Sequence, residues 1–260
     1  MNAPFRADVI DPFIEAHPHQ ILFLTASGAH LYGFPSKDSD YDLRGCHIAP
    51  VEQLISLAPP RETYEVLDRD AAVEVDLVTH DLGKYLKLLL NKNGYVLEQI
   101  FSPMIVSADE RLEELRELSL RCLTRYHFHH FRSFAKNQWE ALQEPGSATV
   151  KKLLYAYRPL LVGITLMREK TVESNIVTLN ERFGLRFIDD LVEAKISGTE
   201  RMPLGETALD EHRFHFEKLN DELTFSSESS GLPEEPAGRE AIDDFLVRTR
   251  LATSRASLVD

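Results

Sequence analysis

The first hundred residues alternate between short apolar runs and turns, which is the pattern of strands mixed with helices. Four segments have the apolar runs or the alternation of β-strands: 21–25, 41–48, 62–68 and 72–80. Leucines at helical spacing then predict a helix over 82–92, with Asp81 as its N-cap. A further short helix is expected over 95–101, before Pro103.

From residue 109 onward the strand signals fade and helical periodicity takes over. Amphipathic helices are expected in these segments: 109–122, 125–143, 148–168, 173–184, 186–197, 206–225 and 238–251. The segment 226–238 is rich in Ser, Pro and Glu and predicts a mobile loop. The layout predicts two domains, an α/β lobe over 1–108 and a helical lobe over 109–260.

The composition is that of an ordinary globular protein with an acidic balance. The chain has 260 residues, of which 43% are hydrophobic and 27% charged, and its formal net charge is −13. Broad, sequence-independent binding of nucleic acid needs clustered Lys and Arg, so this balance argues against it. A local basic patch or a metal-assisted phosphate site remains compatible with the charge.

The cysteines and the apolar runs indicate the compartment. Cys46 and Cys122 lie far apart and form no metal-binding pattern, which favours a reducing environment. The N-terminus has no apolar core of signal-peptide length, and no apolar run is long enough to span a bilayer. We therefore expect a cytoplasmic protein without a membrane partner.

Two pairs of carboxylates on predicted strands are the strongest candidates for chemistry. Asp40 and Asp42 stand two apart, so their side chains share one face of an extended chain. Close carboxylates need a neutralising cation, and hard oxygen ligands favour Mg²⁺ or Mn²⁺. Glu74 and Asp76 form a second pair, which adds a third carboxylate if the two strands are neighbours. Three carboxylates holding two metals suit in-line phosphoryl transfer.

A small-residue turn precedes the first carboxylate pair. Ser27, Gly28 and Ala29 lie between a predicted strand and a short helical segment. Backbone N–H groups in such a turn bind anions, and a helix N-terminus reinforces them. Gly28 allows the close backbone approach that a triphosphate requires. The turn therefore predicts a phosphate cradle beside the metal ligands.

These residues together resemble the DNA polymerase β-like nucleotidyltransferase superfamily. Its signature is a glycine turn after a strand, an Asp-x-Asp about ten residues later, and a third acid on a later strand. Within it, the string SGAHLYGFPSKDSDYDLRG and the later block LNKNGYVLEQIFSP are similar to the RNA-repair-associated nucleotidyltransferase family. The likeness covers roughly residues 20–200. It departs at Ala29, where the family motif has a serine whose hydroxyl contacts phosphate.

The resemblance implies a fold, a reaction and a set of roles. The fold would be α+β, with a polymerase-β-like nucleotidyltransferase lobe built on a mixed sheet and an all-helical C-terminal lobe. The protein would move a nucleoside monophosphate from an NTP to a hydroxyl acceptor, using Mg²⁺ or Mn²⁺. Asp40, Asp42 and Asp76 would bind the metals and be catalytic. The acceptor stays open between an RNA end, a protein side chain and a small molecule.

Basic and aromatic residues on the predicted helix 148–168 have two interpretations. Lys151, Lys152, Tyr155 and Arg158 either bind the nucleotide, through its phosphates and base, or form a solvated basic face. The resemblance favours nucleotide binding by Lys152, Tyr155 and Arg158, together with the turn residues. Arg44 shares the strand face of the carboxylates and either contacts a substrate phosphate or balances their charge.

Two further alternatives follow from what the sequence lacks. His127 and His130 are three apart on a predicted helix, but no acid at metal-binding spacing completes a site, so a partly buried or surface helix is favoured. The loss of the motif hydroxyl at Ala29 favours a second function, a weakened or non-catalytic nucleotide sensor that keeps the fold. The carboxylate trio favours the enzyme.

Overall fold

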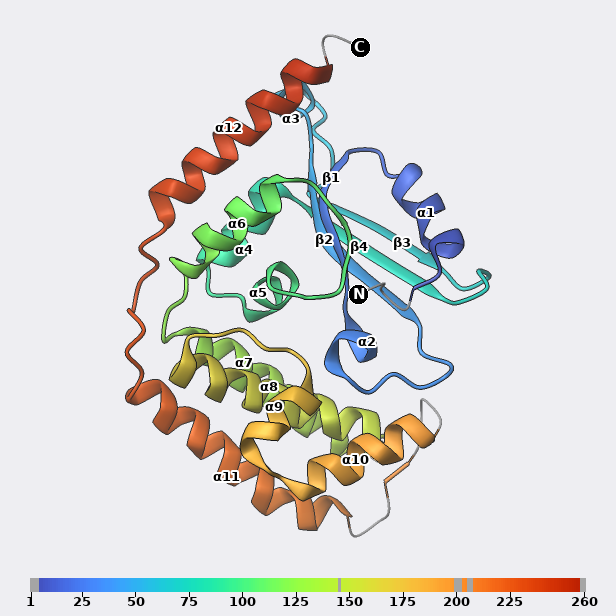
Figure 1. Ribbon diagram of the computed structural model, residues 1–260, viewed down its shortest axis with the longest axis vertical. Coiled ribbons are helices and arrows are strands. Elements are labelled where there is room, and N and C mark those ends of the chain that lie inside the picture. Colours follow the sequence, from blue (N-terminus) through green and yellow to red (C-terminus); the bar gives the residue numbers. More distant parts are fainter. Residues whose placement is uncertain (1–4, 145, 199–202, 205–207, 258–260) are drawn as a thin grey trace. The chain divides into compact units, whose positions relative to one another are not determined.

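The computed structural model describes residues 5–144, 146–198, 203–204 and 208–257 (Figure 1). The start of the predicted helix 206–225 therefore lies outside the described residues. Backbone packing divides the chain into two compact units. The first unit comprises Met1–Gly28, Asp40–Cys122 and Pro236–Asp260, and the second comprises Ala29–Ser39 and Leu123–Glu235. The sequence suggested one boundary after residue 108, whereas the chain passes between the units at four places.

The first unit is built on a five-stranded mixed sheet. Its strands, in the spatial order β3-β4-β2-β1-β5, are β3 (Thr63–Asp68), β4 (Val75–Asp81), β2 (Tyr41–Ile48), β1 (Gln20–Ala26) and β5 (Ile105–Ala108). β2 and β4 run parallel, and every other neighbouring pair is antiparallel. The sheet and the helices that follow confirm the α+β fold class, and β1 to β4 confirm the four predicted strands.

One face of this sheet packs against the helix α1 (Ala7–Glu15). Figure 1 shows α1 beside β1 and β3. Val9 and Ile10 of α1 are buried in a core with Leu24, Leu43 and Leu77 of three strands. Residues two apart on a strand share a face, so this core takes the odd-numbered residues of β2 and β4. The even-numbered residues of β2 and β4, which include Asp42 and Asp76, lie on the opposite face.

The opposite face carries α4 (Leu82–Leu90) and α5 (Gly94–Ile100), both predicted from the sequence. Asp81 accepts a hydrogen bond from the Gly83 N–H at the start of α4, which confirms it as the N-cap. The Tyr85 ring of α4 packs edge-on against Phe23 of β1. The Tyr85 hydroxyl donates to the Val96 carbonyl of α5. These contacts fix both helices over β1 and β2.

The first unit is completed by short and C-terminal helices. They are α3 (Val51–Leu54), α6 (Arg111–Leu120) and α12 (Arg239–Ser257). α12 returns to the sheet and is held there by Arg250, which donates to the buried Asp81 carboxylate at 2.5 Å. The predicted helices 109–122 and 238–251 therefore exist but pack in this unit.

The second unit is helical in its described residues. Its helices are α7 (His127–Leu142), α8 (Val150–Glu169), α9 (Ile176–Phe183), α10 (Arg186–Ser197) and α11 (Ala208–Glu228). α8 is buried along most of its length and packs on α7 and α11. A Cβ atom placed on Gly163 would lie 2.8 Å from Leu223 Cδ1 and 3.1 Å from Phe131 Cβ, so the helices approach closely there. The five predicted helices are confirmed, although α11 continues to Glu228, into the expected loop. None of the described helices is long and apolar enough to span a membrane.

The short helix α2 (Gly28–Tyr32) connects the two units, since it begins at Gly28 and continues into the second unit. Its first residue has a positive φ of 59°. The Phe34 N–H donates to the Ala29 carbonyl at 3.1 Å and ends the helix. β1, this turn and α2 therefore form the strand–turn–helix unit that the sequence predicts.

Candidate functional site

The site is built where β2 and β4 begin. Because the two strands are parallel neighbours, Asp42 lies directly opposite Asp76 in the register. Both side chains project to the face away from α1, and each is partly exposed, by 20% and 35%. The sequence expectation that a later strand acid lies beside the first carboxylate pair thus holds for Asp42 and Asp76.

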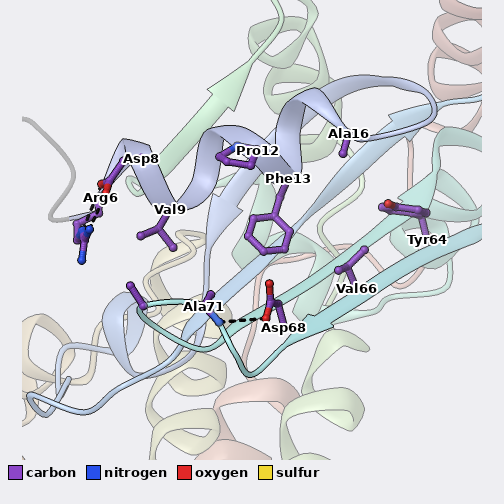
Figure 2. A pocket seen from close by; sticks show the side chains of 11 residues that line it. Arg6, Asp8, Val9, Pro12, Phe13, Ala16, Tyr64, Val66, Asp68 and Ala71 are labelled. Atoms are coloured by element: carbon purple, nitrogen blue, oxygen red, sulfur yellow. Dashed lines mark hydrogen bonds and ion pairs between the residues drawn. The ribbon is translucent and has the colours of Figure 1, made fainter.

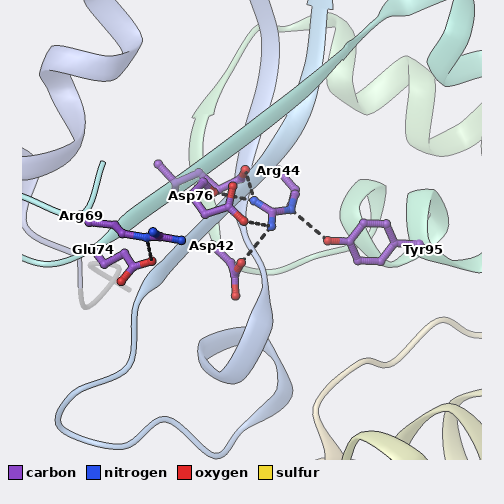
Figure 3. A network of polar contacts seen from close by, with 7 residues as sticks. Asp42, Arg44, Arg69, Glu74, Asp76 and Tyr95 are labelled. Carbon is purple, nitrogen blue, oxygen red and sulfur yellow. Dashed lines mark hydrogen bonds and ion pairs between the residues drawn. The ribbon is translucent and has the colours of Figure 1, made fainter. Parts of the chain in front are cut away.

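Arg44 joins the two carboxylates (Figure 3). Its Nη2 atom donates to Asp42 Oδ1 at 2.9 Å and to Asp76 Oδ2 at 2.6 Å. Its Nη1 atom donates to the Asp76 carbonyl at 2.5 Å. The side chain of Arg44 is only 14% exposed. Its single guanidinium offsets the negative charges of both Asp42 and Asp76. Of the two interpretations of Arg44, the structure shows the charge-balancing one.

Tyr95 of α5 holds the other end of Arg44. The Arg44 Nε atom donates to the Tyr95 hydroxyl at 3.1 Å. Burial alone would lower the pKa of Arg44, but Tyr95, Asp42 and Asp76 together raise it well above its ordinary value. The cation is therefore permanent, and its orientation depends on a phenol from a helix. Nothing in the sequence pattern singles out Tyr95 for this role.

The turn after β1 lies against the Asp42 carboxylate. The Ser27 N–H donates to the Asp42 carbonyl at 2.8 Å. A Cβ atom placed on Gly28 would lie 1.9 Å from Asp42 Oδ2, and the φ of Gly28 is +59°. Both the close approach and the left-handed conformation therefore require glycine. The structure brings Ser27 and Gly28 together with Asp42, as the sequence predicts for a cradle beside a carboxylate.

Asp40 and Glu74 flank this pair without joining it. Asp40 is half-buried just before β2 and forms no hydrogen bond or ion pair with the described residues. Glu74 lies just before β4 and directs its carboxylate to Arg69, at 3.6 Å (Figure 3). Of the two acids that the sequence offered as third ligand, Asp76 is thus the one that shares a cation with Asp42.

The donor chemistry of the pair fits a hard divalent cation. Asp42 and Asp76 direct carboxylate oxygens at one cationic group, the guanidinium of Arg44, in a partly exposed position. Oxygen ligands of this kind suit Mg²⁺ or Mn²⁺. In the described part of the chain, no group of three or more His, Cys, Asp and Glu is already arranged around a metal position. The fold therefore brings the carboxylates of Asp42 and Asp76 together, and Asp40 lies two residues before Asp42 in the sequence.

The remaining predicted nucleotide contacts belong to the second unit. Lys152 lies in the first turn of α8, where its N–H donates to the Thr149 hydroxyl. Tyr155 packs edge-on against Tyr32 at a centroid distance of 5.5 Å. Arg158 is only 2% exposed and stacks on the same Tyr32 ring at 3.6 Å. Within this unit, Tyr155 and Arg158 hold the segment that follows Ala29, which is itself buried.

A pocket of about 500 Å³ lies between α1 and β3 (Figure 2). Phe13 of α1 and Tyr64 and Val66 of β3 line it, and the Arg6–Asp8 ion pair stands at one end. Tyr64 and Val66 are on the α1 face of the sheet, so this pocket opens on the face opposite Asp42 and Asp76. It is not part of the carboxylate site.

A buried histidine group at the other end of the sheet gave no signal in the sequence. His47 is fully buried, and its Nδ1 atom lies 2.8 Å from the Thr79 hydroxyl. The same hydroxyl lies 2.9 Å from His17 Nε2. The three residues are far apart in the sequence, so only the fold brings them together. His127 and His130 were singled out by the sequence; both lie on α7, His127 buried and His130 partly exposed.

The strand–glycine turn, the mixed sheet and the paired strand carboxylates are those of a polymerase-β-like nucleotidyltransferase. Residues 6–248 match RlaP, the RNA repair pathway DNA polymerase beta family, and the chain belongs to that family. The family and the fold suggest a nucleotidyltransferase.

Three proteins illustrate the similarity. Uncharacterized protein MJ0002 of Methanocaldococcus jannaschii is 26% identical over 218 residues, which cover 83% of this chain and 88% of that protein. Uncharacterized protein YcgL of Bacillus subtilis is 28% identical over 155 residues, or 59% of this chain and 58% of YcgL. A nucleotidyltransferase-like protein from Exiguobacterium sibiricum has a solved structure with a TM-score of 0.32 and 18% identity, covering 85% of this chain and 74% of the other.

Proposed function

We propose that the protein is a metal-dependent nucleotidyltransferase that moves a nucleoside monophosphate from an NTP to a hydroxyl acceptor. The acceptor oxygen attacks the α-phosphorus, the bond to the β-phosphate oxygen breaks, and pyrophosphate leaves. Asp76 accepts the proton of the attacking hydroxyl. Asp40, Asp42 and Asp76 would hold Mg²⁺ or Mn²⁺, which would supply positive charge to offset the developing phosphate charge.

One observation carries this proposal. Asp42 and Asp76 meet in register on adjacent parallel strands, and the glycine turn lies against Asp42. A phosphate bound by the turn is therefore beside the carboxylates, within reach of the cation that they hold. Packing alone does not require two partly exposed acids on neighbouring strands around one arginine.

The remaining roles follow from position. Gly28 and Ala29 contribute backbone N–H groups to the triphosphate. Ser27, whose own N–H donates to the Asp42 carbonyl, fixes the turn against β2. Lys152 and Tyr155 contact the nucleotide, and Arg158 acts through Tyr32, on which it stacks. The acceptor is the hydroxyl of an RNA end, in keeping with the RNA-repair family.

The test is a thermal shift with Mn²⁺ and an NTP, followed by transfer from an α-labelled NTP to RNA. We expect Asp42→Asn and Asp76→Asn each to abolish both signals. Each substitution also leaves Arg44 without one carboxylate, so the apo protein loses about 1–3 kcal/mol of stability. The shift is therefore compared with the apo value of the same variant.

Glu74→Gln is the matched control for this test. It removes the same charge close to Asp76, but Glu74 pairs with the exposed Arg69. We expect it to keep the full shift and the transfer. A wild-type shift that survives in both aspartate variants would show that the carboxylates are not the site.

A second candidate function, a nucleotide sensor without transfer, is favoured by Ala29. The alanine removes the hydroxyl that the family motif directs to phosphate, while the carboxylates and the turn stay in place. The two functions separate in the same experiment. A sensor gives the metal-dependent shift but labels no acceptor, whereas the enzyme gives both.

A further inference from the structure

A row of residues along β4 leads away from the carboxylates on the same face of the sheet. Asp76, Val78 and His80 alternate on this face, and all three are partly exposed. At about 3.3 Å per residue, His80 lies about 13 Å from Asp76. The neighbouring edge strand, β3, places Thr63 opposite His80 and Glu65 opposite Val78. This face therefore continues from the reaction site to the sheet edge.

At the far end of the row lies a cation without a counter-ion. The Lys84 ammonium of α4 donates to the Thr63 hydroxyl, which lies 3.0 Å from His80 Nδ1. Lys84 forms no ion pair with any described residue, and the same holds for the exposed Arg61. Burial, together with the charges of Lys84 and Arg44, lowers the pKa of His80 to about 4, so His80 is neutral near pH 7. A partly buried ammonium held only by a hydroxyl favours an anionic ligand.

A polar pocket of about 700 Å³ opens at this position. Arg61, Thr63, Glu65 and Lys84 are among the residues that line it. Glu62 also lines the pocket, but its carboxylate lies 3.9 Å from Lys87 Nζ and is paired there. Glu65 forms no ion pair within the described part of the chain and shares the strand face with Thr63. The pocket thus combines two cations that form no ion pair with a described residue and two carboxylates, one of which is paired with Lys87.

We propose that this β3–α4 pocket binds the phosphodiester backbone of a single-stranded nucleic acid whose terminal hydroxyl lies at Asp42 and Asp76. The inference rests on the proposed function and names the surface that holds its acceptor. Lys84 and Arg61 contact backbone phosphates, and the strand follows the face of Val78 and His80 to the carboxylates. Glu65 weakens the contact and keeps the affinity modest.

The experiment measures binding of a short fluorescent single-stranded RNA to the full chain, by anisotropy at low salt. We expect Lys84→Gln to weaken binding about three- to tenfold, as for the loss of one charged contact. Lys84→Arg keeps the charge and should keep the affinity. Glu65→Gln removes a repulsive charge, so we expect it to tighten binding severalfold.

Lys136→Gln is the control for net charge. Lys136 lies on α7 in the second unit and pairs with Glu140 at 3.6 Å, so its loss should leave RNA affinity unchanged. Inorganic triphosphate serves as the competitor. If the pocket is a site for free polyphosphate, triphosphate should displace the RNA at equal total charge. If the pocket is a site for a strand, the RNA should stay bound.

Two outcomes overturn the inference. One is a wild-type protein that does not bind RNA, and the other is equal affinity in Lys84→Gln, Glu65→Gln and wild type. In either case, the metal- and NTP-dependent thermal shift tells whether the proposed function also fails. A shift that persists leaves the transferase in place with a different acceptor site, whereas a lost shift removes both.

Discussion

At the scale of single residues, Arg44 explains how two close carboxylates are tolerated in a folded sheet. Asp42 and Asp76 lie in register and would repel each other, but both accept hydrogen bonds from one guanidinium. Tyr95 fixes the opposite side of that guanidinium. A divalent cation that binds both carboxylates must compete with Arg44. Binding of metal and nucleotide should therefore either displace the Arg44 guanidinium or leave it sharing the carboxylates with the metal.

Under the proposed function, Ala29 is the residue on which the catalytic strength should depend. Ala29→Ser places a hydroxyl in the first turn of α2, directly after the cradle glycine. A charge-assisted hydrogen bond to a phosphate oxygen contributes about 1.5–3 kcal/mol when it is well aligned. We therefore expect the variant to bind NTP, or to transfer the nucleotide, severalfold better than wild type. Titration by calorimetry and initial rates with labelled NTP measure the two effects.

Ala29→Gly is the companion variant, since it changes the same position without adding a donor. It should not improve binding or transfer. If Ala29→Ser leaves the affinity unchanged and gives no transfer, the sensor function becomes the better account.

The sequence predicts the residues of the site better than their interactions. Asp42, Asp76 and Gly28 stand in a spaced pattern that chemistry and resemblance both single out, and the structure brings them together. Tyr95 could not be predicted, because its contact with Arg44 depends on how α5 packs on the sheet. Sequence spacing indicates which residues share a face, but not which side chain from another element reaches that face.

At the scale of elements, a histidine–threonine–histidine chain joins β2 and β4 to the segment before β1. Thr79 of β4 lies between His47 of β2 and His17, and His19 stacks on His47 at 5.1 Å. Burial, together with His17, His19, His80 and Arg250, lowers the pKa of His47 to about 3. This end of the sheet is therefore assembled with neutral imidazoles.

That chain makes the stability of the first unit depend on pH. Unfolded His47 takes up a proton below pH 6.5, whereas folded His47 does so only near pH 3. Between these values the unfolded state binds more protons, so stability should fall steadily as the pH falls from about 6.5 to about 3. Urea unfolding at several pH values measures the slope.

His47→Gln should make that slope shallower, whatever its effect on stability at neutral pH. His129→Gln, which alters an exposed histidine of α7, should leave the slope as in wild type. Identical slopes in wild type and His47→Gln would mean that other groups control the acid sensitivity.

The elements that the sequence failed to predict have weak local signals. β5 has four residues, partly or fully exposed, and forms only because β1 offers a free edge. α1 contains Pro12, and its N-cap makes no side-chain hydrogen bond. Its burial of Val9 and Ile10 against the sheet stabilises it instead. Tertiary packing, rather than any local sequence pattern, therefore determines that β5 and α1 form.

At the scale of the whole molecule, the acidic charge limits how nucleic acid can bind. The net charge is −13, from 42 acidic and 29 basic residues. Several arginines are already engaged by carboxylates, as Arg111 is by Asp109 and Arg248 by Glu114 and Asp244. Long-range attraction of a polyanion is therefore poor, and binding must depend on a few local contacts.

The salt dependence of RNA binding measures how many such contacts exist. For single strands, the logarithm of the affinity falls by about 0.7 per contacted phosphate for each decade of salt. Lys84 and Arg61, with few contacts from residues such as Lys151 and Lys152, predict a slope of magnitude below about 3 in the absence of metal. Arg158 adds little, because it is buried against Tyr32.

Lys84→Gln should reduce the slope by about 0.7, while Lys136→Gln should not. Tight binding without metal and a steep slope would contradict this, since they require an extended basic surface, and a net charge of −13 opposes one.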